Sequence, residues 1–312
     1  MYKKSDGLKK EKAVEARWCY LFLALPIIGF ILFNVYPILW SMRWAFYSYD
    51  GVAINAKWVG LRNFKSFFTT DLTYWRAWLN TLKLAVYKVP FELALSLVLA
   101  MLLQNGRKGA GLFRSLYYVP NIVSVAIIGV VFSNIFNYFG VINSVLLKLG
   151  IIEDSIDWFA NKNTAMAVLV IGSVWNTFGI NVMYFIAALS GVPKELYESA
   201  ELDGASSWKQ FINITLPMIV KMGQIIVLMS IVGTLSINDY VIALTNGGPA
   251  GGTNTVMSYM TTKFVPGFAD TTTPAIGYGC AMSIVTTILF MFIALGYNKM
   301  NKKLVIYIKG GI

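Results

Sequence analysis

Polar side chains recur at helical spacing along two long apolar segments, and these residues are the best placed to bind a polar molecule. The first segment carries Ser173, Thr177, Asn181 and Tyr184, flanked by Asn176 and Phe178. The second segment carries Ser230, Thr234 and Asn238, followed by Asp239. Intervals of three or four residues place each set on one helix face. Hydroxyl, amide and aromatic groups arranged in this way could line a path for a polar molecule, although the same groups could instead form hydrogen bonds between neighbouring helices.

Residue types that most bond-breaking chemistry needs are scarce. The chain contains no histidine, so neither histidine-based acid–base catalysis nor a histidine metal site is expected. Cys19 and Cys280 fall near opposite ends of their helices, which argues against an internal disulfide. The glycines at 106 and 111 have the spacing of a nucleotide-binding loop, but Leu112 follows where lysine is required. We predict a chain that is not an enzyme and that binds no metal or cofactor itself.

The composition indicates that the apolar segments cross a membrane. The chain is 57% hydrophobic and 13% charged, whereas soluble domains contain about 25% charged residues. Six apolar runs reach the roughly 20 residues that a bilayer requires, and such runs must be helical because hydrocarbon offers the backbone no partners. They cover residues 18–42, 79–103, 119–137, 164–189, 218–244 and 276–297. The first is interpreted as a retained anchor, since its apolar core is too long for a signal peptide. The fold class is therefore all-α, with six transmembrane helices.

Basic residues are concentrated on one side of these predicted spans. Sixteen lie in the two tails and in the segments after the second and fourth spans, against eight on the other side. The positive-inside rule then predicts that the tails, 1–17 and 298–312, are cytoplasmic and that 18–297 forms the membrane domain. The net charge of +11 is spread over several loops, so no nucleic-acid partner is expected.

Segment 192–217, between the fourth and fifth spans, is polar and acidic. The pair Asp203-Gly204 is typical of a sharp bend, because glycine tolerates left-handed backbone. We expect a short helix before the bend and a second one at about residues 206–213. A bent pair of amphipathic helices fits a groove on a partner protein. The alternative is a loop on the lipid surface, where basic helices are more usual.

The spacing within this segment resembles the EAA loop of binding-protein-dependent ABC transporter permeases. The matching positions are Glu198, Ala200, Gly204, Ile214, Leu216 and Pro217. Ser199 stands where the family usually has alanine, and Asp203 precedes the glycine. In that family the loop is the cytoplasmic contact with a separate ATPase. The resemblance therefore implies an ATPase-coupling role for these residues, with ATP and Mg²⁺ on the partner.

Stretches 58–64, 113–121 and 245–249 resemble the carbohydrate-uptake branch, which includes maltose-type and glycerol-phosphate-type permeases. The resemblance implies the type I importer fold, alternating access, and sugar contacts on the fourth and fifth helices. It also implies three kinds of partner: a second permease, two ABC ATPases and an extracytoplasmic sugar-binding protein. A glycerol-phosphate-type substrate remains open, although no arginine lies within the spans. An ion-driven secondary carrier would need inverted repeats and broken helices, and a membrane enzyme would need clustered acids.

Charged residues within or next to the spans lead to two further expectations. Lys88 and Glu92 are spaced to pair on one helix face. Their expected role is structural, with gating or substrate binding as the alternative, because an unpaired charge at that depth is unfavourable. Asp239 lies near the outer end of its helix and is expected to shape an outer gate. Of the outer loops, 46–75 is expected to hold an interfacial helix and 245–275 to be irregular.

Overall fold

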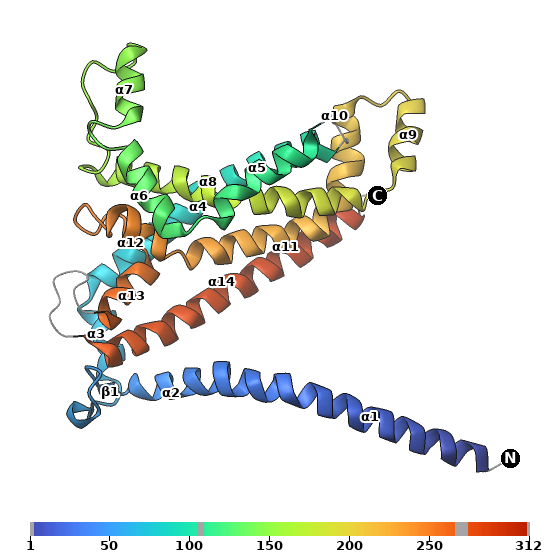
Figure 1. Ribbon diagram of the computed structural model, residues 1–312, viewed down its shortest axis with the longest axis horizontal. Coiled ribbons are helices and arrows are strands. Elements are labelled where there is room, and N and C mark those ends of the chain that lie inside the picture. The colour runs from blue at the N-terminus through green and yellow to red at the C-terminus, as the bar shows by residue number, and fades with distance from the viewer. Residues whose placement is uncertain (1–2, 105–108, 266–273, 311–312) are drawn as a thin grey trace.

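The protein is a bundle of long helices with smaller helices at both ends (Figure 1). The computed structural model describes residues 3–104, 109–265 and 274–310. The helices that make up the apolar spans are α1 (Lys3–Phe30), α2 (Tyr36–Trp44), α4 (Leu72–Gln104), α5 (Ala110–Ile122), α6 (Val125–Ile135), α8 (Lys162–Ser190), α11 (Leu216–Leu235) and α14 (Ile276–Gly310). The short helices are α3 (Arg62–Thr69), α7 (Val141–Lys148), α9 (Lys194–Leu202), α10 (Ser207–Gln210), α12 (Asp239–Thr245) and α13 (Val256–Phe264). Strands β1 (Tyr47–Ser48) and β2 (Lys57–Trp58) pair antiparallel.

Five helices in the described part of the chain are long and apolar enough to cross a membrane, and a bent pair accounts for the sixth span. The pair is α5 and α6, which meet at an angle of 96°. The third span was expected to be a single helix over 119–137, and this expectation is wrong because the chain bends between Ile122 and Val125. The last turn of α5 leaves free backbone carbonyls, and the Asn176 side chain of α8 donates to one of them, at Pro120, over 2.8 Å.

Two of the spans contain a π-helical turn shortly before a proline. Residues Ile31–Val35 join α1 to α2 ahead of Pro37, and Phe211–Thr215 join α10 to α11 ahead of Pro217. Proline lacks the N–H for the helical hydrogen bond and its ring crowds the carbonyl four residues earlier. The helix widens at these points and continues. The separate short helix expected at about 206–213 is therefore wrong, because it is continuous with the fifth span over Ser207–Leu235.

The fifth span also ends earlier than the hydrophobic run at 218–244 suggested. Helix α11 stops at Leu235, and α12 begins only at Asp239. The backbone of Asn238 between them is not helical, with φ −134° and ψ −68°. The break separates the polar face of α11 from the acidic start of α12.

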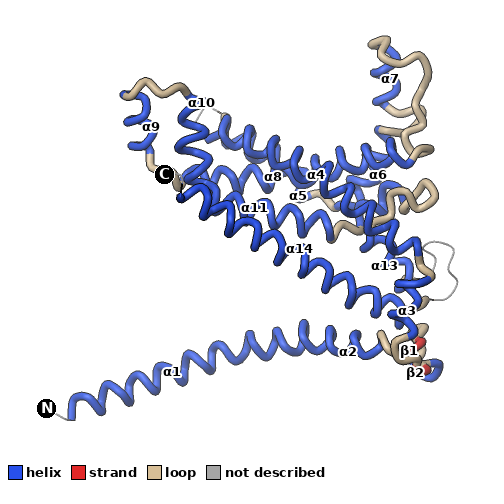
Figure 2. The backbone as a smooth tube through the Cα atoms, turned by 180° about the vertical axis from the view of Figure 1, so that it is seen from behind, coloured by secondary structure: helices blue, strands red, loops and turns tan. Residues whose placement is uncertain are grey.

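The core of the bundle is formed by α4, α8 and α11, with α5 and α14 packed around them. The crossing of α5 and α8 depends on Gly179, because a Cβ there would lie 1.8 Å from the carbonyl oxygen of Tyr117. By contrast, α1 diverges from the bundle (Figure 2), and the apolar window of the span at residues 15–44 is 0% buried. The apolar side chains of this span are therefore exposed to the surroundings of the chain over the window that the structure describes.

Both views place the start of α1, α9, α10 and the end of α14 at one end of the bundle, termed the inner end. Helices α3, α7 and α13 lie at the opposite, outer end. The arrangement agrees with two tails and the segment 192–217 on the same side of a membrane. The excess of lysine and arginine at this end predicts that it faces the cytoplasm.

The outer end is held together by polar contacts between segments far apart in sequence. Asp71, before α4, accepts hydrogen bonds from the hydroxyls of Tyr259 in α13 and Tyr278 in α14, at 2.9 and 2.8 Å. The expectation of an irregular loop over 245–275 is wrong for α13. A capping box formed by Thr255 and Ser258 begins that helix, since each side chain satisfies a backbone N–H of the first turn.

Candidate functional site

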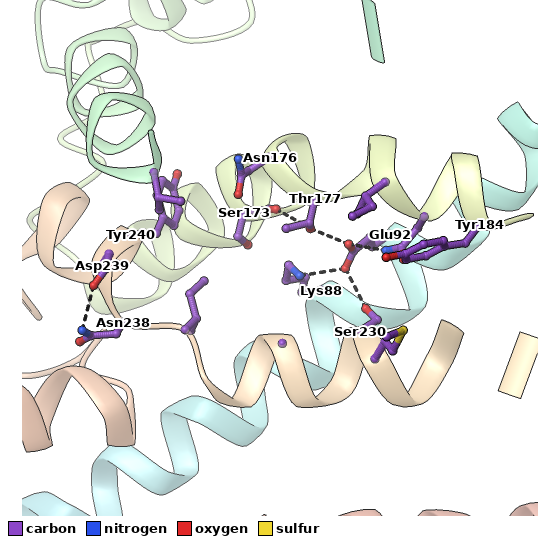
Figure 3. A pocket seen from close by; sticks show the side chains of 16 residues that line it. Lys88, Glu92, Ser173, Asn176, Thr177, Tyr184, Ser230, Asn238, Asp239 and Tyr240 are labelled. Atoms are coloured by element: carbon purple, nitrogen blue, oxygen red, sulfur yellow. Dashed lines mark hydrogen bonds and ion pairs between the residues drawn. The ribbon is translucent and has the colours of Figure 1, made fainter. Parts of the chain in front are cut away.

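A cavity of about 360 Å³ lies between α4, α8, α11 and the start of α12 (Figure 3). Most of the residues that sequence periodicity singled out line it. These are Ser173, Asn176, Thr177, Asn181 and Tyr184 from α8, Ser230 from α11, and Asn238 and Asp239 from the break before and the first turn of α12. The size falls within the usual range of small-molecule pockets, about 300–1,000 Å³. Hydroxyl, amide and carboxylate groups from separate helices thus surround one space.

Two of the expected path residues lie elsewhere. Phe178 is buried on another side of α8, where its ring meets Tyr117 of α5 edge to face with centroids 5.7 Å apart. Thr234 is 1% exposed and lies behind the cavity wall, where its hydroxyl donates to the backbone carbonyl of Ser230. Their positions follow from the rotation of α8 and α11 about their axes. Sequence spacing gives the face that residues share, but not the direction of that face.

The carboxylate of Glu92 lies at the centre of a hydrogen-bond network, the central network, that joins α4, α8 and α11. Its Oε1 accepts from Thr177 Oγ1 at 2.5 Å and from Asn181 Nδ2 at 2.8 Å. Its Oε2 accepts from Lys88 Nζ at 2.9 Å and from Ser230 Oγ at 3.1 Å. A carboxylate offers about four lone-pair sites, so Glu92 is saturated. The Glu92 side chain is only 1% exposed. Its four hydrogen bonds offset the unfavourable free energy of burying a charge.

Lys88 completes the network from the preceding turn of α4. Its ammonium pairs with Glu92 and also donates to Thr234 Oγ1 at 3.1 Å. The expected ion pair of Lys88 with Glu92 is confirmed. The hydrogen bonds that join this ion pair to α8 and α11 could not be predicted from the sequence. The four partner side chains, Thr177, Asn181, Ser230 and Thr234, lie 85 to 146 residues away in the chain. Figure 3 shows both charged side chains between the polar faces of α8 and α11.

The outer boundary of the cavity is formed at the break between α11 and α12. Asn238 donates from Nδ2 to Asp239 Oδ1 over 2.9 Å and accepts from Thr261 Oγ1 of α13 over 3.1 Å. Asp239 occupies the first turn of α12, where a negative charge faces the positive end of the helix dipole. The sequence pointed to both residues, but it missed Tyr240, which lines the cavity beside them. Its adjacency to Asp239 was the only available signal.

A second candidate site lies at the inner end, in the inner elbow formed by α9, Asp203–Ser206 and α10. Gly204 bends the chain with φ +73°, a left-handed conformation that side chains disfavour. Among the described residues, no heavy atom lies within 4 Å of where a Cβ of Gly204 would stand. The glycine is thus required by backbone conformation and not by lack of space.

The side chains of the inner elbow are largely exposed. Glu198 and Asp203 are exposed, and Leu202 is 90% exposed. Ala200 and Ile214 are partly buried, as is Pro217, whereas Leu216 is exposed. Tyr197 holds α9 against the base of α11, since its hydroxyl lies 2.8 Å from Thr215 Oγ1. An exposed acidic and apolar surface on a fixed bend is suited to contact another protein.

A hollow of about 880 Å³ separates the inner elbow from the ends of α4 and α8. Its walls include Gln104, Lys194, Glu198 and Glu201. Gln104 donates to the carbonyl of Leu189 over 2.9 Å and ties the inner ends of α4 and α8 together. The inner elbow therefore stands off the ends of α4 and α8, and it is joined to the bundle by the continuous helix α10–α11 and by the contact of Tyr197 with Thr215.

Comparison with known proteins agrees with this architecture. The family described as "Binding-protein-dependent transport system inner membrane component" matches residues 92–302. The probable ABC transporter permease protein YesP of Bacillus subtilis (strain 168) is 33% identical over 299 residues, covering 93% of each chain. The lactose transport system permease protein LacF of Rhizobium radiobacter is 32% identical over 256 residues, covering 80% of this chain and 85% of that one.

A solved structure shares the fold. The bacterial alginate ABC transporter, crystallised in complex with alginate pentasaccharide-bound periplasmic protein, matches with a TM-score of 0.78 and 21% identity. The match covers 94% of this chain and 97% of that one. The helices, the bent third span and the family match lead to one conclusion: this chain belongs to the family of binding-protein-dependent transport system inner membrane components, and it is a multi-pass protein of the inner membrane.

Proposed function

We propose that this chain is a permease subunit of an ATP-driven importer that passes a sugar or oligosaccharide into the cytoplasm. The observation that carries the proposal is the central cavity, which brings hydroxyl and amide groups of α8 and α11 together inside a membrane helix bundle. Sugars are recognised by such groups because each hydroxyl both donates and accepts hydrogen bonds. The names of relatives that transport lactose or alginate support the same substrate class.

Transport proceeds by alternating access between the two ends of the bundle. Two ABC ATPases bind ATP and Mg²⁺, and one of them receives the inner elbow of this chain in a groove on its surface. Glu198 supplies a carboxylate for an arginine or lysine of the ATPase, and Gly204 keeps α9 at the angle that fits the groove. Movement of the ATPases is transmitted through Ile214, Leu216 and Pro217 to α11, which lines the cavity. Since α10 and α11 form one continuous helix, displacement at the inner elbow reaches Ser230 without an intervening hinge.

Partners at the remaining surfaces complete the importer. A loaded sugar-binding protein docks at the outer end, near Asp239 and helices α3, α7 and α13. A second, homologous permease covers the open side of the cavity, and lipid surrounds the assembly. The exposed α1 supports the need for further protein or lipid against this chain.

Affinity purification and reconstitution test the proposal. The tagged chain is expected to copurify with an ABC ATPase and a second permease. In liposomes, the complex with its binding protein should hydrolyse ATP faster when supplied with one member of a panel comprising lactose, maltose, arabinotriose, alginate trisaccharide and glycerol 3-phosphate. Stimulation by glycerol 3-phosphate alone would reassign the substrate. Uptake that continues without ATP and stops when an ionophore collapses the ion gradients would overturn the proposal in favour of a secondary carrier.

A further inference from the structure

The ammonium of Lys88 has a hydrogen-bond donor to spare. In the described part of the chain, its Nζ donates to Glu92 and to Thr234. A protonated lysine carries three N–H groups, so one has no acceptor among the described residues. Lys88 lines the cavity, while its side chain is otherwise enclosed and only 4% exposed. A buried donor without a partner is unfavourable, and the cavity is the space in which a partner can be found.

Glu92, unlike Lys88, has no hydrogen-bonding capacity to spare. Its two oxygens already accept four hydrogen bonds, from Lys88, Thr177, Asn181 and Ser230. The carboxylate therefore has no capacity left for a ligand in this arrangement. What it does is hold the Lys88 side chain in place, because the two groups form an ion pair of 2.9 Å one helical turn apart. Glu92 is thus a positioning residue, and Lys88 is the residue that can reach a ligand.

The charges around the cavity indicate what kind of ligand Lys88 meets. Among the described residues that line it, three are charged: Lys88, Glu92 and Asp239. The positive charge of Lys88 is already balanced by Glu92, and Asp239 adds a negative charge at the outer boundary. An anionic ligand would meet this excess negative charge with no free cation to compensate, in a site where burial strengthens electrostatic interactions. An uncharged ligand with oxygen acceptors meets no such penalty.

On the basis of the proposed sugar transport, we propose that Lys88 donates a hydrogen bond to an oxygen of an uncharged sugar in the cavity. Glu92 positions Lys88 for this contact, and the balanced pair favours neutral sugars over uronates and phosphates. The same two residues thus account for both a binding contact and a charge preference.

The variant that tests the contact is Lys88→Met combined with Glu92→Gln. It removes the ammonium without leaving an unpaired buried carboxylate, and the glutamine oxygen can still accept from Thr177 or Asn181. Lys83→Met serves as the control, because Lys83 lies on the same helix, is exposed and does not line the cavity. The measurement uses the full complex with its binding protein in liposomes and records sugar molecules imported per ATP hydrolysed.

We expect this ratio to fall at least about tenfold in the double variant, in line with loss of one charge-assisted hydrogen bond, and to stay at the wild-type value in Lys83→Met. A purely structural role would lower import and ATP hydrolysis in proportion, so an unchanged ratio would overturn the proposal. Should the double variant not assemble, Lys88→Arg keeps the charge but displaces the donors, and an unchanged ratio there has the same meaning. Failure of the proposed function looks different, because then the wild-type complex imports no sugar of the panel.

The charge preference is tested by equilibrium binding to the wild-type complex in detergent, without the binding protein. The probes are radiolabelled lactose and alginate trisaccharide, chosen to differ in charge. Should lactose not be the panel sugar that stimulates ATP hydrolysis, the neutral sugar that does so replaces it. We expect the neutral probe to bind at least about tenfold more tightly than the uronate. Equal binding, or tighter binding of the uronate, would overturn the preference for neutral sugars.

Discussion

Acidic residues occur in two contrasting settings, in the central network and on the inner elbow. Glu92 is 1% exposed and accepts four hydrogen bonds from three helices. Glu198 and Glu201 are exposed on α9, and in the described part of the chain neither side chain has a hydrogen-bond partner. A buried charge must be satisfied within the fold, whereas an exposed one is solvated and free to meet a partner. Glu92 therefore contributes to the stability of the bundle, whereas the exposed carboxylates of the inner elbow are the ones we expect to contact other proteins.

The largest expected effect comes from breaking the central network. Glu92→Leu leaves the Lys88 ammonium buried without its counter-ion, which costs about 3–5 kcal/mol. The thermal denaturation midpoint of the purified complex should fall sharply. The paired variant Lys88→Met with Glu92→Gln should recover most of this stability because it removes both charges. A single variant as stable as the wild type would show that the network does not stabilise the fold.

A smaller effect is expected from crowding the α5–α8 crossing. In Gly179→Ala the new Cβ would lie 1.8 Å from the carbonyl oxygen of Tyr117, and overpacking of this kind costs about 1–3 kcal/mol. Gly223→Ala in α11 is the matched control, since none of the described atoms lies within 4 Å of its Cβ position. The denaturation midpoint should fall in the first variant only. Equal midpoints in the two variants would mean that α5 and α8 can move apart at Gly179 without loss of folding free energy.

At the inner elbow, Gly204→Val should act on coupling more than on folding. The left-handed conformation costs an ordinary residue about 1–2 kcal/mol, but no described atom is close enough to be crowded. We expect normal membrane insertion, less copurified ATPase and loss of ATP-driven uptake. Gly204→Asn is the control, because asparagine tolerates this conformation better. Normal uptake in the valine variant would contradict the coupling role.

The smallest effect is expected at the outer boundary of the cavity. Asp239→Asn removes the charge at the start of α12 while keeping a side chain of similar size. Loss of a favourable dipole interaction of about 0.3–1 kcal/mol would change a rate or affinity about two- to fivefold. The uptake rate and binding-protein-stimulated ATP hydrolysis measure this. If both remain at the wild-type value, Asp239 has no part in an outer gate.

Sequence reasoning was most successful where the signal is local. The apolar runs gave all six spans, and the pair Asp203-Gly204 gave the bend that φ +73° at Gly204 displays. Sequence reasoning failed where the effect of a proline, or the position of a helix end, depends on contacts with other parts of the fold. A continuous helix through Pro217 needs the widened π turn before it. The bend between α5 and α6 is supported by Asn176 of another helix.

For the candidate site, periodicity identified the polar faces of α8 and α11, but their orientation came from packing. Ser230 faces the cavity while Thr234, one turn later, lies behind its wall. Phe178 shares a helix with Asn181 yet packs against α5. Residues on one helix face point in a range of directions. The spacing of residues in the sequence therefore cannot distinguish a side chain that lines a cavity from one that packs behind the lining residues.

The sequence by itself predicted six membrane spans, a basic side that faces the cytoplasm, and a bent acidic segment at 192–217. These properties depend on composition and on residues close together in the chain. Only the tertiary structure decided that Glu92 accepts hydrogen bonds from α4, α8 and α11 and that Lys88, bonded to Glu92 and Thr234 among the described residues, lines a cavity. Hydrogen bonds between helices depend on how each helix is rotated and placed against its neighbours, and this is set by packing of the whole bundle.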